Sequence, residues 1–253
     1  MLNYVEYGKE NKYDDDIFFQ KYSQMSRSQQ GLAGAGEWET LRKLLPDFKD
    51  KRVLDLGCGY GWHCIYAMEH GASSVVGVDI SHKMLEVAKE KTHFPQVEYK
   101  CCAIEDVEFP EERFDVILSS LAFHYVADYE ILVKKIYRIL KSGGKLVFTV
   151  EHPVFTAYGT QDWYYNEKGE ILHFPVDNYY YEGKRTAVFL GEKVTKFHRT
   201  LTTYLNTLLS NGFIINHIVE PQPPEYMMDI PGMQDEMRRP MMLIVSANKK
   251  VDR

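Results

Sequence analysis

The chain has 253 residues, of which 45% are hydrophobic and 26% charged, a composition typical of globular proteins and not of disordered ones. Its formal net charge of −6 argues against a nucleic-acid phosphate backbone as the main partner. It lacks an apolar run near the ~20 residues that cross a bilayer, and its acidic N-terminus lacks a signal-peptide pattern, so we expect a cytoplasmic protein.

The cysteines predict no metal site. None of them forms a CxxC pair, and two cysteines adjacent in sequence are poor joint ligands for one ion. In a reducing compartment such residues are usually small buried hydrophobic side chains. The residues concerned are Cys58, Cys64, Cys101 and Cys102.

The predicted secondary structure starts with mixed polar and helical signals and then alternates between strand and helix. A helical apolar pattern over 38–45 ends at Pro46. Beyond it, short aliphatic runs predict buried strands, and amphipathic runs predict helices. In chain order these are strand 52–56, helix 62–70, strand 74–80, helix 82–91, strand 97–101, strand 114–119, helix 129–140 (ended by the glycines at 143 and 144) and strand 145–150. This alternation predicts a parallel sheet covered by helices on both faces.

Residues 152–197 interrupt the alternation with a segment rich in tyrosine, phenylalanine and tryptophan. Turn signals at 166–169 and 182–183 predict hairpins within it. The elements expected after it are helix 200–210, strand 213–219, a loop rich in proline and methionine over 221–240, and strand 241–246. Because the chain shows no internal repeat and no low-complexity linker, we predict one domain over 1–253 that carries an insertion.

The strand at 52–56 runs directly into a glycine loop. The sequence from Val53 reads VLDLGCGYG, so Gly57, Gly59 and Gly61 stand between a strand and a helix. Glycines there bring bare backbone close to a ligand at a helix N-terminus. A glycine pattern alone is a weak signal, but the strand–turn–helix context makes it a candidate binding loop.

An acidic residue ends the next predicted strand. Asp79 stands 24 positions after Asp55. In doubly wound folds a carboxylate about 20 residues beyond the loop accepts hydrogen bonds from ribose hydroxyls. The alternative is an aspartate that only supports the start of the helix after Ser81. With the glycine loop upstream, the ribose interpretation is favoured.

Two ligand classes compete for this loop. A dinucleotide-binding loop reads GxGxxG and holds a pyrophosphate, whereas this loop reads GxGxG and has Asp55 two residues before its first glycine. A carboxylate there would repel a pyrophosphate and attract an ammonium group. S-adenosylmethionine carries an ammonium and a sulfonium and no phosphate, so the chemistry favours it over NAD as the cofactor.

The run from Asp55 to Gly61 is similar to the first motif of class I S-adenosylmethionine-dependent methyltransferases. Further stretches resemble the small-molecule subgroup called methyltransferase type 11. These stretches are EDVEFPEERFD over 105–115, SSLAFHYV over 119–126 and LKSGG over 140–144. The resemblance, which covers roughly residues 50–152, implies a Rossmann-like α/β fold. We expect a doubly wound, mostly parallel seven-stranded sheet with the last strand antiparallel.

The resemblance also implies how the chain is divided and which residues meet the cofactor. The parts are an N-terminal helical segment over the cofactor (1–50), a cofactor-binding core (51–151), a cap-like insertion (152–198) and a C-terminal part that completes the sheet (199–253). Asp55 would organise the methionine end and Asp79 would hold the ribose. The backbone of Gly57, Cys58, Gly59 and Gly61 would line the methionine end, Ile80, Ile104 and Glu105 would meet the adenine, and Ser119 and Leu121 would lie under the sulfonium.

Two positions need separate comment. The family usually has an acid for the adenine amino group where this chain has Ala103, so adenine recognition must rely on the backbone near Ile104, or on Glu105 or Asp106. In the resembling enzymes an N-terminal helix often folds over the cofactor, and Arg27 on such a helix could pair with its carboxylate. The alternative for Arg27 is a solvated surface residue.

Methyl transfer is an in-line displacement that requires positioning and exclusion of water, and a base only if the accepting atom starts protonated. His124 follows the fourth predicted strand, and Glu151 and His152 follow the fifth. All three therefore lie at the sheet edge where open α/β folds bind ligands, and they are our candidates on the substrate side. The alternatives are aromatic packing for His124, and orientation of the turn at Pro153 for the other two.

The sequence therefore predicts methylation of a small molecule. Enzymes that methylate DNA amino groups carry Asn/Asp-Pro-Pro-Tyr/Phe where this chain reads SSLA over 119–122, which disfavours DNA. The aromatic insertion either forms a lid that stacks on a planar or cationic substrate or packs a small β-cap. A catalytically silent protein that binds the cofactor as a sensor or scaffold, and a nicotinamide-dependent oxidoreductase, are the alternative functions. The oligomeric state is left open.

Overall fold

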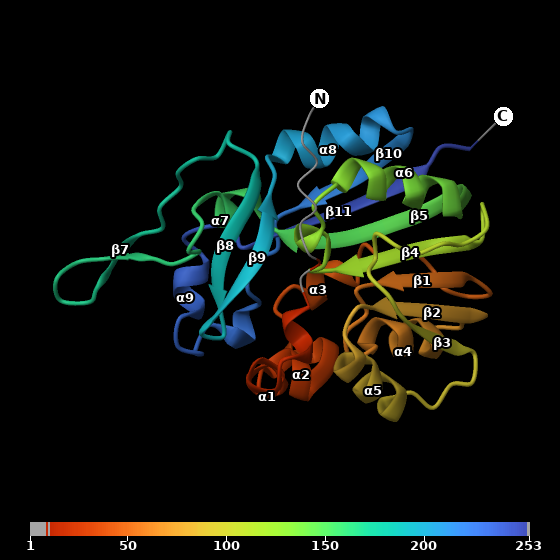
Figure 1. Ribbon diagram of the computed structural model, residues 1–253, viewed down its shortest axis with the longest axis horizontal. Helices are drawn as coiled ribbons and strands as arrows, with labels where there is room; N and C mark the ends of the chain where they lie inside the picture. Colours follow the sequence, from red (N-terminus) through yellow and green to blue (C-terminus); the bar gives the residue numbers. More distant parts are fainter. Residues whose placement is uncertain (1–8, 10, 252–253) are drawn as a thin grey trace.

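A seven-stranded sheet forms the centre of the protein (Figure 1). The computed structural model describes residue 9 and residues 11–251; the ends of the predicted N-terminal and C-terminal parts, at 1–8, 10 and 252–253, lie outside the described residues. The strand order is β10-β11-β5-β4-β1-β2-β3. The strands are β1 (Arg52–Leu56), β2 (Ser74–Asp79), β3 (Val97–Cys101), β4 (Phe114–Ser120), β5 (Leu140–Glu151), β10 (Phe213–Val219) and β11 (Met242–Lys249). Only β11 runs antiparallel to its neighbours, which confirms the predicted doubly wound sheet.

Helices cover both faces of this sheet, as the alternation predicted. On one face the core contains α6 (Tyr129–Ile139) and α8 (Leu201–Ser210), and on the other α3 (Trp38–Leu41), α4 (Trp62–Glu69) and α5 (His82–Lys91). The apolar residues of α6 recur at helical spacing, so that Leu132, Val133, Ile136 and Ile139 all point to the sheet and are at most 1% exposed. Burial of these stripes, rather than helix propensity, is what stabilises the helices.

The parallel strands bring their carboxyl ends to a single edge of the sheet. Strands β1, β2, β4 and β5 end at Leu56, Asp79, Ser120 and Glu151. In register, Asp55 lies between Gly77 of β2 and Leu118 of β4. Four segments that are distant in sequence thus deliver their following loops to one place, which is where such folds bind ligands.

The N-terminal segment folds over this edge. It contains η1 (Lys12–Asp14), α1 (Asp16–Ser23), α2 (Ser26–Gln30) and η2 (Gly31–Gly34). Asp14 attaches the segment to the start of α5, because its carboxylate accepts hydrogen bonds from the Ser81 hydroxyl at 2.6 Å and the Lys83 backbone at 3.1 Å. A charged acceptor at a helix N-terminus is favourable, so this contact holds the segment in place.

The insertion after β5 lies beside the same edge (Figure 1). It contains α7 (Pro153–Ala157), the hairpin β6 (Tyr164–Tyr165) with β7 (Ile171–His173), and the hairpin β8 (Gly183–Phe189) with β9 (Glu192–His198). Phe18 of α1 packs against Ala187 and Val194 of the second hairpin, and all three are at most 2% exposed. The remaining short elements are η3 (Phe123–Tyr125), η4 (Glu225–Met227) and α9 (Met233–Glu236).

Several predicted boundaries were wrong. The helix predicted over 38–45 ends at Leu41. Residues 140–144, expected to end a helix, belong to β5, whose pairing with β4 shifts register between Phe114 and Val116. The turn of the second hairpin lies at Leu190 and Gly191 and not at 182–183, where β8 begins. For β5 and the second hairpin, pairing with another strand decided the outcome over the local signal.

Two further predictions concern the cysteines and the membrane. Cys58 and Cys64 are buried as expected, but Cys101 is exposed because it ends the edge strand β3, and Cys102 after it is half-buried. The described residues contain no cluster of three or more histidine, cysteine or acidic side chains arranged to hold a metal ion. Among the described residues, 9 and 11–251, no helix combines the length and the apolar character required to cross a membrane.

Candidate active site

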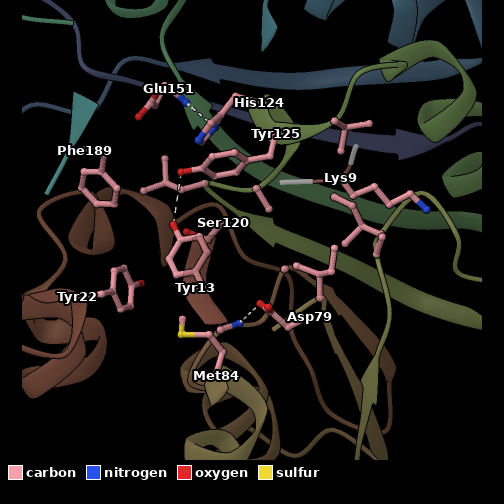
Figure 2. A pocket seen from close by; sticks show the side chains of 18 of the residues that line it. Lys9, Tyr13, Tyr22, Asp79, Met84, Ser120, His124, Tyr125, Glu151 and Phe189 are labelled. Atoms are coloured by element: carbon pink, nitrogen blue, oxygen red, sulfur yellow. Dashed lines mark hydrogen bonds between the residues drawn. The ribbon is translucent and has the colours of Figure 1, made fainter. Parts of the chain in front are cut away.

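A cavity of about 220 Å³ lies at the carboxyl edge of the sheet, between the strand ends and the N-terminal segment. The N-terminal segment contributes Lys9, Tyr13, Tyr22, Met25 and Arg27; the first two strand ends contribute Gly57, Gly59, Asp79, Ile80 and Met84. Later strand ends and loops contribute Ala103, Ile104, Glu105, Ser120, Leu121, Ala122, His124, Tyr125, Val126, Glu151, Phe189, Met241 and Met242. Figure 2 shows how these side chains converge, with Asp79 and Met84 at one end and His124 and Glu151 at the other.

The glycine loop is closely packed around backbone that only glycine adopts readily. The φ angles of Gly57, Gly59 and Gly61 are +78°, +53° and +76°. A Cβ atom on Gly57 would lie 2.4 Å from Cβ of Ala122, and one on Gly61 would lie 2.2 Å from Oη of Tyr99. The backbone nitrogens of the loop donate to the end of β2, which fixes its shape. The sequence signal therefore has a steric cause at Gly57 and Gly61.

The four loop residues do not face the same space. Gly57 and Gly59 line the cavity, and with Cys58 they also line a smaller hollow beside it, next to Arg27 and Glu37. Gly61 instead forms the N-cap of α4 in the left-handed conformation. The loop thus presents its first three residues to ligand space and uses its last glycine to start the helix.

Asp79 joins the glycine loop to the cavity. Its Oδ2 accepts a hydrogen bond from the Gly59 backbone at 2.8 Å, and its Oδ1 accepts one from the Ser81 backbone at 2.9 Å. Burial raises the pKa of this carboxyl above its usual value, although both hydrogen bonds act in the opposite direction. Since each carboxylate oxygen has a second lone pair, Asp79 retains acceptor capacity toward the cavity.

Asp55, on β1 two residues before Gly57, is 1% exposed and lines neither the cavity nor the neighbouring hollow. Its Oδ2 accepts a weak hydrogen bond from the Cys64 thiol at 3.5 Å, and its Oδ1 has no hydrogen-bond partner among the described residues. Burial raises the pKa of this carboxyl to about 7. A buried carboxylate without a cationic partner is costly, and a ligand that carries an ammonium would relieve that cost.

Arg27 is half-buried and is not a solvated surface residue. Its Nη2 lies 2.6 and 2.8 Å from the two carboxylate oxygens of Glu37, and it lines both the cavity and the neighbouring hollow. The Arg27–Glu37 pair therefore places a positive and a negative group side by side next to the glycine loop. Such a pair suits the carboxylate and ammonium of an amino-acid group.

The residues expected around the adenine and the sulfonium are only partly in the cavity. Ile80, Ile104, Glu105 and Leu121 line it. Ser119 does not, because its hydroxyl is buried and donates to the Leu56 carbonyl at 2.8 Å between β4 and β1. The next residue, Ser120, faces the cavity instead. Side chains alternate between the faces of a strand, so the shift by one residue changes which serine faces the ligand space.

His124 and Glu151 meet at the other end of the cavity (Figure 2). The Glu151 backbone donates to Nδ1 of His124 at 3.4 Å. Burial lowers the pKa of His124 to about 4, so the ring is neutral near pH 7. Burial alone would raise the pKa of Glu151, but the His124 ring, the Lys196 ammonium and a hydrogen bond from Gln161 together lower it, so Glu151 is an anion.

His152 lies outside this arrangement. Its Nδ1 accepts a hydrogen bond from the Val154 backbone at 3.0 Å and so caps α7, and its Nε2 lies 2.8 Å from the Glu220 carboxylate. These contacts correspond to the structural alternative, orientation of the turn at Pro153. The three substrate-side candidates are therefore separated by the structure into a pair at the cavity and one residue that shapes the insertion.

Sequence reasoning missed the aromatic lining and one buried lysine. Tyr13 and Tyr125 approach with their hydroxyls 3.4 Å apart, and Phe189 reaches the cavity from the insertion. Lys196 on β9 pairs with Glu151 and is only 2% exposed. A signal was available, since Val194 and Lys196 are two positions apart and therefore share one face of a strand, where the valine marks the buried side.

Comparisons with known proteins identify the family of the chain. A family model described as a methyltransferase domain matches residues 54–148. A structure from Listeria monocytogenes, described as an S-adenosylmethionine dependent methyltransferase, is 58% identical and covers 87% of this chain and 99% of that one, with a TM-score of 0.83. Another from Mesorhizobium loti with the same description is 40% identical and covers 86% of this chain and 100% of that one, with a TM-score of 0.80.

A ubiquinone biosynthesis O-methyltransferase from Coxiella burnetii is 37% identical over 112 residues, which is 44% of this chain and 47% of that protein. The match with this relative thus spans about half of its length. The full-length similarity to the two solved structures, together with the matched domain, identifies the family. The chain belongs to the class I S-adenosylmethionine-dependent methyltransferases with a methyltransferase domain of type 11, and S-adenosylmethionine is its cofactor.

Proposed function

We propose that the methyl acceptor is a small molecule that binds in the cavity between the glycine loop and the pair formed by His124 and Glu151. The observation that carries this proposal is the enclosure of that end by aromatic rings: Tyr13, Tyr125 and Phe189 line it from the N-terminal segment, the loop after β4 and the insertion. A mostly apolar and aromatic lining with few polar groups is typical of sites for small ligands. The Coxiella relative, a ubiquinone biosynthesis O-methyltransferase, is in line with this class.

The residues present fit the cofactor. Asp55 offers an unpartnered buried oxygen, and Arg27 with Glu37 offers a charge pair beside the glycine loop. We assign the methionine end of S-adenosylmethionine to these groups, its ribose to Asp79, and its adenine to the apolar positions at Ile80 and Ile104. When bound, the cofactor supplies a methyl group on a positively charged sulfur.

The contribution of the chain itself is positioning. His124 accepts the Glu151 backbone hydrogen bond at Nδ1, so the proton of the neutral ring sits on Nε2. In that tautomer Nε2 donates a hydrogen bond and does not accept a proton. His124 therefore orients an acceptor atom and keeps its lone pair toward the methyl group, while the aromatic lining excludes water.

Turnover separates this proposal from a silent binding protein. We expect calorimetric titration to show micromolar binding of S-adenosylmethionine and S-adenosylhomocysteine, and no binding of NAD. The acceptor panel contains catechol, benzylamine, thiophenol and benzoate, incubated with S-adenosylmethionine that carries a deuterated methyl group. A mass increase on at least one compound supports the enzyme. Tight cofactor binding without transfer to any compound in this or a wider metabolite panel would favour a sensor or scaffold.

Asp79→Ala is expected to weaken S-adenosylmethionine binding about 10- to 100-fold, because one charge-assisted hydrogen bond is worth ~1.5–3 kcal/mol. The matched control is Asp128→Ala. The Asp128 carboxylate also accepts a backbone hydrogen bond, from Ile131 at 2.9 Å, but it caps α6 and does not line the cavity. Titration calorimetry should show parent-like affinity for the control, and equal affinity in both variants would contradict the assignment of Asp79.

A further inference from the structure

Glu151 takes part in a closed set of three contacts with the insertion. Nζ of Lys196 lies 2.5 Å from Oε1 of Glu151 and 2.9 Å from Oε1 of Gln161. Nε2 of Gln161 donates to Oε2 of Glu151 at 2.7 Å. Each carboxylate oxygen therefore has one partner from the insertion, and the carboxylate cannot rotate without breaking one of these bonds.

Stability alone does not account for this arrangement, because burying the charges of Lys196 and Glu151 costs free energy. The side chains of Lys196 and Glu151 are 3% and 12% exposed, so both charges have left most of their water. Replacing a buried ion pair by apolar residues is often neutral or stabilising, and a buried pair is therefore weak evidence for a role in stability. The Phe189 ring, 5.5 Å from Nζ, adds a modest cation–π attraction.

Of the three residues in this set of contacts, only Glu151 lines the cavity. Glu151 lines the cavity beside His124 (Figure 2), whereas Lys196 and Gln161 are not among the residues that line it. A carboxylate oxygen accepts two hydrogen bonds, and each oxygen of Glu151 has one partner in the insertion. The remaining capacity is available to a molecule in the cavity.

We propose that Lys196 is a positioning residue for methyl transfer: with Gln161 it holds Glu151 as an oriented anion that accepts a hydrogen bond from an O–H or N–H group of the acceptor and would take that proton when the acceptor atom gains the methyl group. This inference rests on the proposed function of the cavity. It assigns the substrate class: methyl acceptors that carry a hydrogen-bond donor. Compounds with an anionic carboxylate should be poor acceptors, because the negative charge of Glu151 would repel them. The insertion thereby completes a site that the sheet alone does not form.

The charge balance explains why Lys196 matters. The titratable groups that face Glu151 are His124 from η3, Lys196 from β9 and Tyr204 from α8. His124 is neutral near pH 7, so Lys196 is the cation that offsets the burial of the carboxylate. The coulombic effect of His124 on Glu151 requires a protonated ring, so loss of Lys196 removes the charge that lowers the pKa of Glu151 near pH 7, and that pKa rises.

The test compares Lys196→Met, Lys196→Arg and Glu151→Gln with a matched control, Lys249→Met. Lys249 is also buried, at 6% exposure, with Glu112 at 3.3 Å and the Tyr137 ring at 4.7 Å from its Nζ, but it lies at the end of β11 away from the cavity. The Glu151 side-chain carbon is followed by NMR in ¹³C-glutamate-labelled protein with S-adenosylhomocysteine bound. Its signal is identified by its absence in Glu151→Gln.

We expect the Glu151 signal to stay ionised from about pH 5 to pH 9 in the parent and in Lys249→Met, and to titrate within that range in Lys196→Met. Lys196→Arg should restore the parent behaviour. With the panel compound that reacts best, Lys196→Met should lose about tenfold or more of its rate near pH 6 and recover part of it near pH 9, because the carboxylate regains its charge there. Lys249→Met should show the parent pH profile.

Parallel pH profiles for the two methionine variants, or a Glu151 signal unaffected by Lys196→Met, would overturn the proposal. So would a benzoate rate above those of catechol and benzylamine, or parent-level transfer by Glu151→Gln. The NMR titration needs no acceptor. If the Glu151 signal responds to Lys196→Met but no compound in this or a wider metabolite panel is methylated, Lys196 still holds the charge of Glu151, and it is the proposed function that fails.

Discussion

Asp55→Asn is expected to raise the stability of the cofactor-free protein while it weakens S-adenosylmethionine binding about 10- to 100-fold, through loss of one charge-assisted contact. The carboxyl is 1% exposed and one of its oxygens has no partner among the described residues. Such a group costs stability in the free protein and gains a partner only when a cation arrives. The same residue is then unfavourable for folding and favourable for binding.

The sign of the pH dependence follows from the pKa of Asp55, which is about 7 in the folded protein and about 3.9 in an unfolded chain. Between these values the folded state holds a proton that the unfolded state has lost, so the free energy of unfolding falls as the pH rises, and the penalty is complete above about pH 7. Its full size is about 4 kcal/mol, at 1.36 kcal/mol for each pKa unit. We expect asparagine to recover ~2 kcal/mol, since its amide also needs partners.

Thermal unfolding of the cofactor-free variants provides the measurement. Near pH 8 the gain of ~2 kcal/mol should raise the Tm of Asp55→Asn by about 4–8 °C, and the difference should vanish near pH 5. Asp115→Asn is the control, for which we expect the opposite change, a lower Tm at neutral pH. Asp115 pairs with Lys141 at 2.5 Å; burial alone would raise its pKa, but its hydrogen bonds and nearby cations lower it, so the carboxylate stabilises the protein at neutral pH. A lower Tm for Asp55→Asn at pH 8 would refute the argument.

Gly57→Ala is expected to abolish measurable cofactor binding and to destabilise the protein by ~3 kcal/mol or more, because overpacking and backbone strain add. The new Cβ would lie 2.4 Å from Cβ of Ala122 in the loop after β4, at a φ of +78°. The loop cannot move away without breaking the backbone hydrogen bonds of Gly57 and Cys58 to Val78. Titration calorimetry and denaturant unfolding measure the two effects.

Two variants separate the steric term from the backbone term. Gly169 has the same φ of +78° but no atom within 4 Å of its Cβ position, so Gly169→Ala should cost only the backbone strain of ~1 kcal/mol and leave binding intact. Adding Ala122→Gly to Gly57→Ala removes the clash and should restore part of the stability. If Gly57→Ala bound S-adenosylmethionine within threefold of the parent, the packing of this loop would not be a determinant of the site.

The cofactor half of the site was readable from the sequence because its signals are local. The glycine loop and Asp55 stand within one strand–turn–helix unit, and Asp79 ends the next strand, so the parallel connection brings them together. The alternation of strands and helices likewise predicted the sheet, since burial on both faces produces continuous apolar runs. Even here the prediction was wrong by one residue, because Ser120 and not Ser119 faces the cavity. Which residues of a strand face the ligand depends on how the strand pairs with its neighbours.

Of the acceptor half, only His124 and Glu151 could be read in this way, because each lies at or just beyond the end of a parallel strand. Tyr13, Tyr125 and the hairpin that carries Phe189 and Lys196 come from three distant segments, which meet only through packing of the N-terminal segment and the insertion on the sheet edge. Amino-acid sequence by itself determined the family fold, the cofactor loop and the acidic residues that flank it, because short-range periodicity and turn chemistry encode them. Tertiary structure alone decided that His124 is neutral, that Glu151 is charged and that Lys196 holds it, since burial and charge pairing between distant residues have no local signature.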